Sequence, residues 1–178
     1  LLYNDLAVME GVNPQQLLLT TGSDGAIRTV FQSFVEQGMF TSTNNHEVVE
    51  CADILILAVK PQVMSEVLKP LAHIVQQKKP LIISIAAGIS VDSISHWLGG
   101  SLSVVRAMPN TPALIGRGVT GISAGSRATT KQITMVEELF ATVGKSLVIP
   151  EEQIDALSTI SGSGPAYVFY FIEEFIET

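Results

Sequence analysis

The sequence predicts an α/β fold in which a mainly parallel sheet is flanked by helices on both faces. Short apolar runs of strand length recur through the first 150 residues, and segments with a helical apolar period separate them. Strands that alternate with helices need crossover connections, which place the strands parallel and bury both faces of the sheet. The expected strands are residues 16–21, 53–59, 81–86, 101–107, 118–124 and 145–149.

Four helices are expected between these strands, because apolar side chains recur there every three or four residues. Pro61 suits the first turn of the second helix, and Pro70 predicts a bend within it. Ser90 and Thr129 are suited to cap the third and fourth helices. The expected helices are residues 26–37, 62–76, 90–98 and 130–143.

The pattern changes after Pro150. Residues 153–159 favour a helix, a Ser-Gly-Ser-Gly-Pro stretch at 161–165 interrupts it, and residues 166–176 are apolar on nearly every face. A helix that is apolar all round must be buried, and a membrane span would need about 20 residues. We therefore expect the start of a second, helical domain, whose last helix is covered by more of its own chain or by another protomer.

The amino-acid composition limits the classes of protein to which the chain can belong. Of the 178 residues, 47% are hydrophobic, so the chain can fold around a core and remain soluble. The net charge of −7 and the scattered Lys and Arg argue against nucleic-acid binding. The single cysteine, Cys51, fits a reducing compartment and has no metal-ligand spacing with any histidine, so no metal site is expected. The first residues show neither an initiator Met nor a signal peptide, so we expect a chain truncated at its N-terminus.

Small or polar residues follow three successive strands, and ligands of open α/β sheets bind outside such strand ends. Each stretch also has a purely structural explanation: a solvated lysine, a tight turn after a buried strand, and side chains that serve local backbone groups. Their recurrence at successive strand ends favours one shared pocket. The residues are Ala58, Val59, Lys60 and Pro61; Ala86, Ala87 and Gly88; and Asn110, Thr111 and Pro112.

The loop after the first expected strand is where dinucleotide folds hold the adenosine ribose. Asp24 would favour NAD there, whereas the hydroxyls of Thr21 and Ser23, together with Arg28, would favour NADP. We expect the phosphorylated cofactor, although an exposed turn explains these residues nearly as well. The Gly-rich turn that is the strongest signal for a dinucleotide does not occur in the chain.

Two further motifs point to other chemistry. Residues 121–125 match the G-x-S-x-G nucleophile elbow, but all three histidines precede Ser123, which is the wrong order for that class of hydrolase. The glycines and serines at 161–164 resemble a phosphate-binding loop without its lysine, so a capped helix start is the simpler interpretation. Glu151 and Glu152 are candidates for a general acid, or they simply favour a helix N-terminus.

Read in order, four stretches between residues 58 and 167 resemble pyrroline-5-carboxylate reductase. The resemblance implies a Rossmann-like NAD(P)-binding domain over residues 1–150, without its first strand and Gly-rich turn. It also implies the truncated start of an all-α dimerisation domain over residues 151–178. This family uses NADPH or NADH to reduce 1-pyrroline-5-carboxylate to L-proline. The stretches are Ala-Val-Lys-Pro-Gln at 58–62, Ser-Ile-Ala-Ala-Gly-Ile-Ser at 84–90, Val-Arg-Ala-Met-Pro-Asn-Thr-Pro-Ala at 105–113 and Ser-Gly-Ser-Gly-Pro-Ala-Tyr at 161–167.

The resemblance also implies roles for individual residues. Ser23 and Asp24 fall near the adenosine ribose, and Glu152 matches a position near the proline pocket. It identifies no catalytic proton donor in this chain. Seven positions match those around the nicotinamide cofactor in the family: Asn45, Ala58, Val59, Lys60, Pro61, Ala86 and Ala87.

The family further implies a homodimer or larger homo-oligomer formed through the C-terminal helices, in the cytoplasm or in mitochondria. Two alternatives remain open at this point. Another NAD(P)-dependent reductase, of the 3-hydroxyacid dehydrogenase type, would place a catalytic lysine on the first helix of the second domain, and residues 161–167 contain no lysine. A catalytically inactive cofactor-binding or dimer-forming fragment is the other alternative.

Overall fold

The computed structural model of the chain describes residues 17–21 and 42–176. Within these residues, strands form one sheet in the order in which they occur along the chain, and all the predicted strands are confirmed. Each pair of neighbours is parallel except β4 and β5, which run antiparallel. The strands are β1 (Leu17–Thr21), β2 (Ile54–Ala58), β3 (Leu81–Ser84), β4 (Val104–Met108), β5 (Gly118–Ala124) and β6 (Gly144–Val148).

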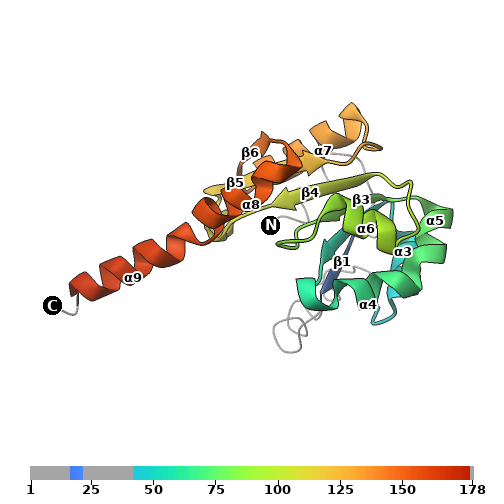
Figure 1. Cartoon of the computed structure of the whole chain (residues 1–178), viewed down its shortest axis with the longest axis horizontal. Helices are drawn as coiled ribbons and strands as arrows, with labels where there is room; N and C mark the ends of the chain where they lie inside the picture. Colours follow the sequence, from blue (N-terminus) through green and yellow to red (C-terminus); the bar gives the residue numbers. More distant parts are fainter. Residues whose placement is uncertain (1–16, 22–41, 177–178) are drawn as a thin grey trace.

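Helices cover both faces of the sheet, as predicted (Figure 1). On one face, Leu55, Leu57 and Ile82 pack in a core with side chains of four helices. On the other face, Ile54 and Ile56 belong to a second core, to which α7 (Thr130–Ala141) contributes. Because successive side chains of a strand point to opposite faces, β2 and β3 need apolar residues at nearly every position. The four helices are α3 (Asn45–Cys51), α4 (Met64–Leu68), α5 (Ala72–Lys78) and α6 (Val91–Trp97).

Local chemistry explains the helix boundaries. The predicted bend at Pro70 is a 3₁₀ turn, Lys69–Leu71, that separates α4 from α5. The Ser90 hydroxyl accepts a hydrogen bond from the amide of Ser93, and Thr129 forms a reciprocal capping box with Gln132. Both predicted caps are therefore confirmed. The predicted helix at 26–37 lies outside the described residues, and α3 was not predicted because seven residues are too few to show a helical period.

The C-terminal segment leaves the sheet as a nearly continuous helical path. A 3₁₀ turn (Glu151–Gln153) leads into α8 (Ile154–Leu157), and a π-helical turn, Ser158–Gly162, connects α8 to α9 (Gly164–Ile176). The predicted interruption at 161–165 is thus a change of helical winding rather than a loop. The predicted domain boundary at 150 falls between β6 and the 3₁₀ turn, and that these are separate domains stays a prediction.

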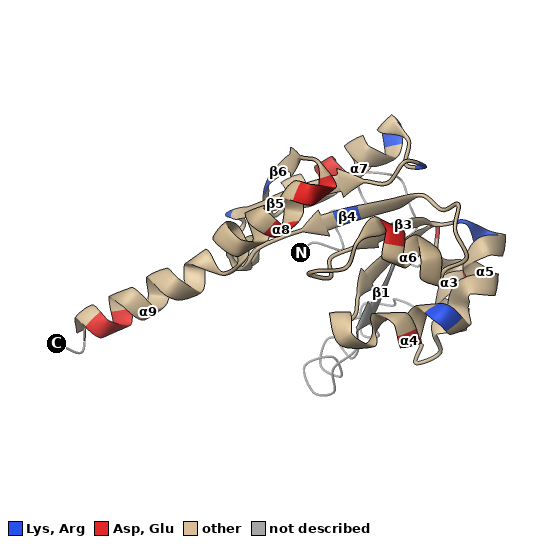
Figure 2. Ribbon diagram, viewed as in Figure 1, with Lys and Arg blue, Asp and Glu red and all other residues tan. Residues whose placement is uncertain are grey.

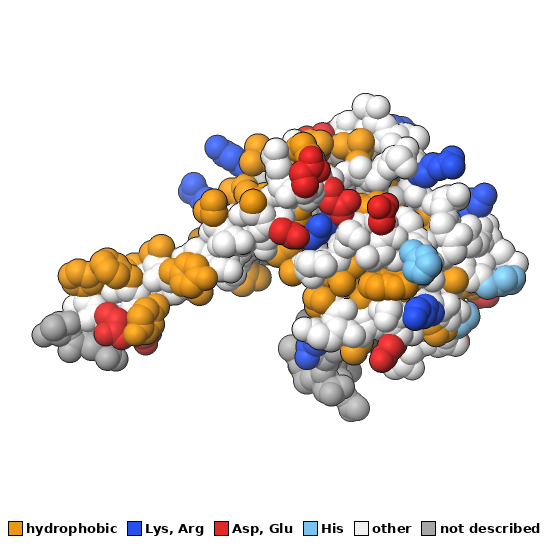
Figure 3. All heavy atoms as spheres, in the orientation of Figure 1, with side chains coloured by type: hydrophobic (Ala, Val, Ile, Leu, Met, Phe, Trp, Pro, Cys, Tyr) orange, Lys and Arg blue, Asp and Glu red, His pale blue; other side chains and the backbone are white. Residues whose placement is uncertain are grey.

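Helix α9 extends away from the sheet (Figure 1), and apolar side chains lie along the face of it that Figure 3 shows. Its large apolar residues from Tyr167 to Ile176 are all exposed. Phe169, Phe171 and Phe175 are 64%, 64% and 69% exposed. No described helix is both long enough and apolar enough to cross a bilayer. Acidic and basic side chains are spread over the described elements, without a basic stripe (Figure 2).

Candidate functional site

The carboxyl ends of the first four strands lie at one edge of the sheet, because these strands are parallel. Residue register aligns Thr21 with Ala58, Leu57 with Ser84, and Ser84 with Arg106. The three stretches singled out in the sequence therefore start side by side, as predicted. That they line one shared pocket stays a prediction.

At the end of β2, the side chains become more exposed as the strand passes into a turn. Val59 is buried at 5% exposure, whereas Lys60 is exposed and its ammonium forms no ion pair with any described residue. The backbone carbonyl of Lys60 accepts a hydrogen bond from Val63 at 3.1 Å, which closes the 3₁₀ turn that Pro61 begins. The turn thus fixes the lysine backbone and leaves its charge available to an anionic group.

At the end of β3, the chain turns tightly. Ser84 is fully buried, and its hydroxyl accepts a hydrogen bond from the amide of Ala86 at 3.4 Å. Ala86 is 5% exposed, Ala87 is exposed, and Gly88 adopts a φ of 69°, which favours glycine. The structure therefore contains the tight turn that the sequence allowed after this buried strand. The small side chains of the turn are also compatible with a flat ring lying against it.

Of the remaining residues that the resemblance assigns to the cofactor, only Asn45 is among the described residues. Asn45 is the first residue of α3 and half-buried, and no hydrogen bond joins its side chain to the strand ends among the described residues. Ser23 and Asp24 lie outside the described residues, as does Arg28. The register of Thr21 with Ala58 shows only that the loop after β1 begins at the edge of the candidate site.

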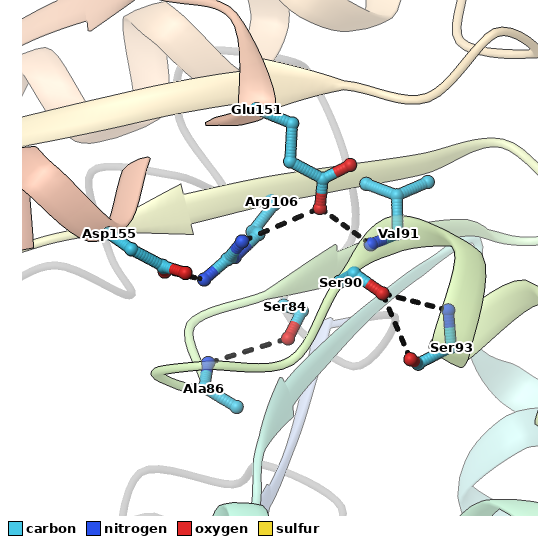
Figure 4. A network of polar contacts seen from close by, with 8 residues as sticks. All are labelled: Ser84, Ala86, Ser90, Val91, Ser93, Arg106, Glu151 and Asp155. Atoms are coloured by element: carbon cyan, nitrogen blue, oxygen red, sulfur yellow. Dashed lines mark hydrogen bonds and ion pairs between the residues drawn. The ribbon is translucent and has the colours of Figure 1, made fainter. Parts of the chain in front are cut away.

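A buried arginine, Arg106, forms an ion-pair network with two more exposed carboxylates beside these strand ends (Figure 4). The Arg106 side chain on β4 is 4% exposed, and its Nη2 lies 2.6 Å from Oδ1 of Asp155. Its Nη1 lies 3.4 Å from Oε1 of Glu151, and the same oxygen accepts a hydrogen bond from the amide of Val91 at 2.7 Å. Paired carboxylates offset the cost of burying a guanidinium, although its Nε has no partner among the described residues.

Asn110 forms a second connection between β4 and the C-terminal segment. Its Nδ2 donates to the carbonyl of Ser161 at 3.1 Å, and its Oδ1 accepts from the amide of Val119 at 2.9 Å. The structural interpretation, in which Asn110 serves local backbone groups, is thus incomplete, because one of its two backbone partners lies 51 residues away. Sequence reasoning missed Arg106 and Asp155 as well. A charged residue inside the apolar run 104–107 was the available signal for a buried ion pair.

Glu152 is exposed and forms no hydrogen bond with any described residue, so its assignment to a proline pocket stays a prediction. Its neighbour Glu151 is the carboxylate that faces the sheet. Ser123 lies buried inside β5, opposite Arg106, rather than on a turn, which agrees with rejecting the hydrolase interpretation. In the part of the chain that the structure describes, no group of His, Cys, Asp or Glu could hold a metal ion.

Comparison with known proteins agrees with this architecture. The family described as NADP oxidoreductase, coenzyme F420-dependent, matches residues 8–88, and the family described as pyrroline-5-carboxylate reductase dimerisation matches residues 151–178. The fold and these matches define a Rossmann-like protein that is similar to NADP-linked oxidoreductases.

Individual relatives narrow this class. A pyrroline-5-carboxylate reductase from Corynebacterium melassecola is 33% identical over 96% of the chain, which covers 63% of that protein. The structure of the enzyme from Coxiella burnetii matches with a TM-score of 0.81 at 32% identity, over 97% of this chain and 63% of that one. The chain belongs to the pyrroline-5-carboxylate reductase family.

A third relative bears on the cofactor. The structure of pyrroline carboxylate reductase from Plasmodium falciparum with NADP bound matches with a TM-score of 0.78 at 27% identity, over 99% of this chain and 63% of that one. The chain spans less than two thirds of the length of each of these three relatives.

Proposed function

We propose that the protein reduces 1-pyrroline-5-carboxylate to L-proline with NADPH or NADH, the last step of proline biosynthesis. The observation that carries the proposal is the identity of 33% to a curated reductase of this name over 96% of the chain. The geometry supports it, because the family-like stretches after β2, β3 and β4 start at one sheet edge.

The residues at this edge fit a dinucleotide. The ammonium of Lys60, which pairs with no described residue, suits a ribose hydroxyl or phosphate, and Ala58, Val59 and Pro61 would adjoin the cofactor there. Ala86 and Ala87 carry only methyl groups, so a flat nicotinamide ring can approach the backbone closely. When bound, the cofactor supplies a hydride to the carbon of the substrate's C=N bond.

The protein's contribution to the reaction is then alignment and exclusion of water. The iminium form of the imine is the better hydride acceptor, so the site must keep the ring nitrogen protonated. No described residue is assigned as the proton donor. We assign Lys60 to the cofactor and Glu152 to the neighbourhood of the proline pocket, and neither to acid catalysis.

We propose that the protein uses NADPH in preference to NADH. The relative from Plasmodium falciparum holds NADP, and one matching family is described as an NADP oxidoreductase. Thr21, Ser23 and Arg28 supply groups suited to a 2′-phosphate, against the single carboxylate of Asp24.

Helix α9 is proposed as part of a homodimer or larger homo-oligomer, in a cytoplasmic protein. Its apolar side chains are exposed on every face, which is unfavourable unless another surface covers them. The match of residues 151–178 to the reductase dimerisation family supports a second copy as that surface.

The test is imine-dependent oxidation of NADPH and NADH by the protein, expressed with any sequence that flanks it in its gene. Turnover with 1-pyrroline-5-carboxylate and release of L-proline are the expected results. If NADPH binds but the imine is not reduced, 3-hydroxyacids become the substrates to test. If the chain binds NADPH and dimerises without turning over any substrate, it is a cofactor-binding fragment.

A further inference from the structure

The carboxylate of Glu151 contacts two parts of the molecule that are distant in sequence. Its Oε1 accepts the amide hydrogen of Val91 at 2.7 Å and lies 3.4 Å from Nη1 of Arg106 (Figure 4). Val91 is the first residue of α6, directly after the loop 85–90 that contains Ala86 and Ala87. One oxygen therefore connects the candidate nicotinamide loop to the start of the C-terminal segment.

This contact exceeds what α6 needs in order to begin. The hydroxyl of Ser90 already caps the helix through the amide of Ser93 at 3.1 Å, and Asp92 supplies an acidic residue in the first turn. Glu151 adds a charge-assisted hydrogen bond from a position 60 residues further along the chain. Such a long-range contact fixes the position of the helix start relative to the residues around Glu151.

Arg106 fixes the carboxylate in turn. Its guanidinium lies between Glu151 and Asp155, and its backbone pairs in register with Ser84, where the loop 85–90 leaves the sheet. The loop is thus held at its start by the hydrogen bond from Ala86 to Ser84, and at its end by Glu151. A movement of the loop that displaces Val91 must break the contact with Glu151 or move the C-terminal segment with it.

We propose that Glu151 is a positioning residue that couples the loop 85–90 to the segment 151–162. Binding of a dinucleotide against the loop and ordering of the segment are then thermodynamically linked. The inference rests on the proposed function, which places the nicotinamide cofactor at Ala86 and Ala87. Because linkage is reciprocal, whatever orders the segment also tightens cofactor binding.

The experiment is amide hydrogen exchange, with and without NADPH, on the whole protein, its Glu151→Gln variant and a control, Glu138→Gln. Glutamine keeps an oxygen that can accept from Val91 and removes the charge that pairs with Arg106. Glu138 is exposed on α7, which packs on the opposite face of the sheet, so the control makes the same change in charge elsewhere. The NADPH dissociation constant is measured on all three proteins.

In the wild type and the control, NADPH should slow exchange at 86–91 and also at 151–158. In Glu151→Gln, it should slow exchange at 86–91 alone, with a dissociation constant raised about fivefold, the low end of site-to-site coupling. A residue with only a structural role would change exchange in the free protein but not this response to NADPH.

Three results would overturn the inference. Protection confined to 86–91 in the wild type would refute the linkage and leave the proposed function standing, and this result needs no folded variant. An equal response of 151–158 in wild type and Glu151→Gln would show that another contact carries the coupling. Absence of NADPH binding to the wild type would reject both the coupling and the proposed cofactor.

Discussion

Asn110 donates a hydrogen bond to the carbonyl of Ser161, 51 residues further along the chain, at a distance of 3.1 Å. This contact places the π-helical turn that leads into α9 beside the exit of β4. The apolar helix therefore leaves the sheet at the same edge as the candidate cofactor residues.

Asn110→Ala should lower the free energy of unfolding by about 1–3 kcal/mol, because it leaves the Ser161 carbonyl and the Val119 amide without their partner. Urea denaturation measures the change. Thr111→Ala is the control, since that side chain is exposed and forms no described hydrogen bond. Equal stability of the two variants would show that water replaces Asn110 at no cost.

Gly121→Ala should destabilise the protein by about 1–3 kcal/mol, because a Cβ on β5 would collide with the side chain of Leu157 on α8. Shortening the opposing side chain with Leu157→Ala should make the Gly121→Ala change less costly, which a double-mutant cycle detects. Gly164→Ala is the comparison variant: at the first residue of α9 its Cβ would meet nothing within 4 Å apart from its chain neighbours, so it should cost less than Gly121→Ala, the cost coming only from the following Pro165. A cost at Gly121 that persists in the Leu157→Ala background would contradict the close-packing explanation.

Lys60→Met should raise the KM for NADPH about tenfold, or about 1.4 kcal/mol, and leave kcat nearly unchanged. The reason is the loss of one charge-assisted contact to the cofactor, while methionine keeps the apolar stem. Lys69→Met makes the same change at another exposed lysine, in the 3₁₀ turn between α4 and α5, and should not alter KM. Steady-state kinetics with varied NADPH measures both; a fall in kcat alone would assign Lys60 to the chemical step instead.

Phe171→Asp should weaken self-association about 30-fold or more, the loss typical of a central aromatic residue in an interface. Phe171 is 64% exposed and packs edge-to-face on Phe175, with ring centroids 4.9 Å apart. Sedimentation velocity over a dilution series measures the dissociation constant, and Phe171→Leu should cost much less because it stays apolar. Unchanged association of the aspartate variant would show that α9 does not form the interface.

The strands could be predicted from the sequence because buried strands of a parallel sheet are apolar at nearly every position. Ile82 and Ile83 point to opposite faces of the sheet and are both fully buried. The apolar residues of such a strand therefore form an uninterrupted run in the sequence. The caps Ser90 and Thr129 were predictable for a similar reason, since capping depends on three or four neighbouring residues.

The network around Arg106 could not be predicted in the same way. The Arg106 side chain shows by its place in an apolar strand that it needs a partner, but its partners lie 45 and 49 residues away. Nothing local distinguishes Glu151, which faces the sheet, from Glu152, which is exposed. Which of the two carboxylates contacts Arg106 depends on how the 3₁₀ turn packs against β4 and α6, and that packing is a property of the tertiary fold.

The antiparallel pairing of β4 and β5 has a practical consequence for labelling this protein. Because β5 runs back toward the beginning of β4, with Ala124 opposite Val105, the turn at 125–129 lies across the sheet from Lys60 and Ala86. Ser126 and Arg127 in this turn are exposed. A fluorophore attached at Ser126 would therefore lie beside the beginning of β4, at the opposite end of that strand from Met108 and from the strand ends that form the candidate site.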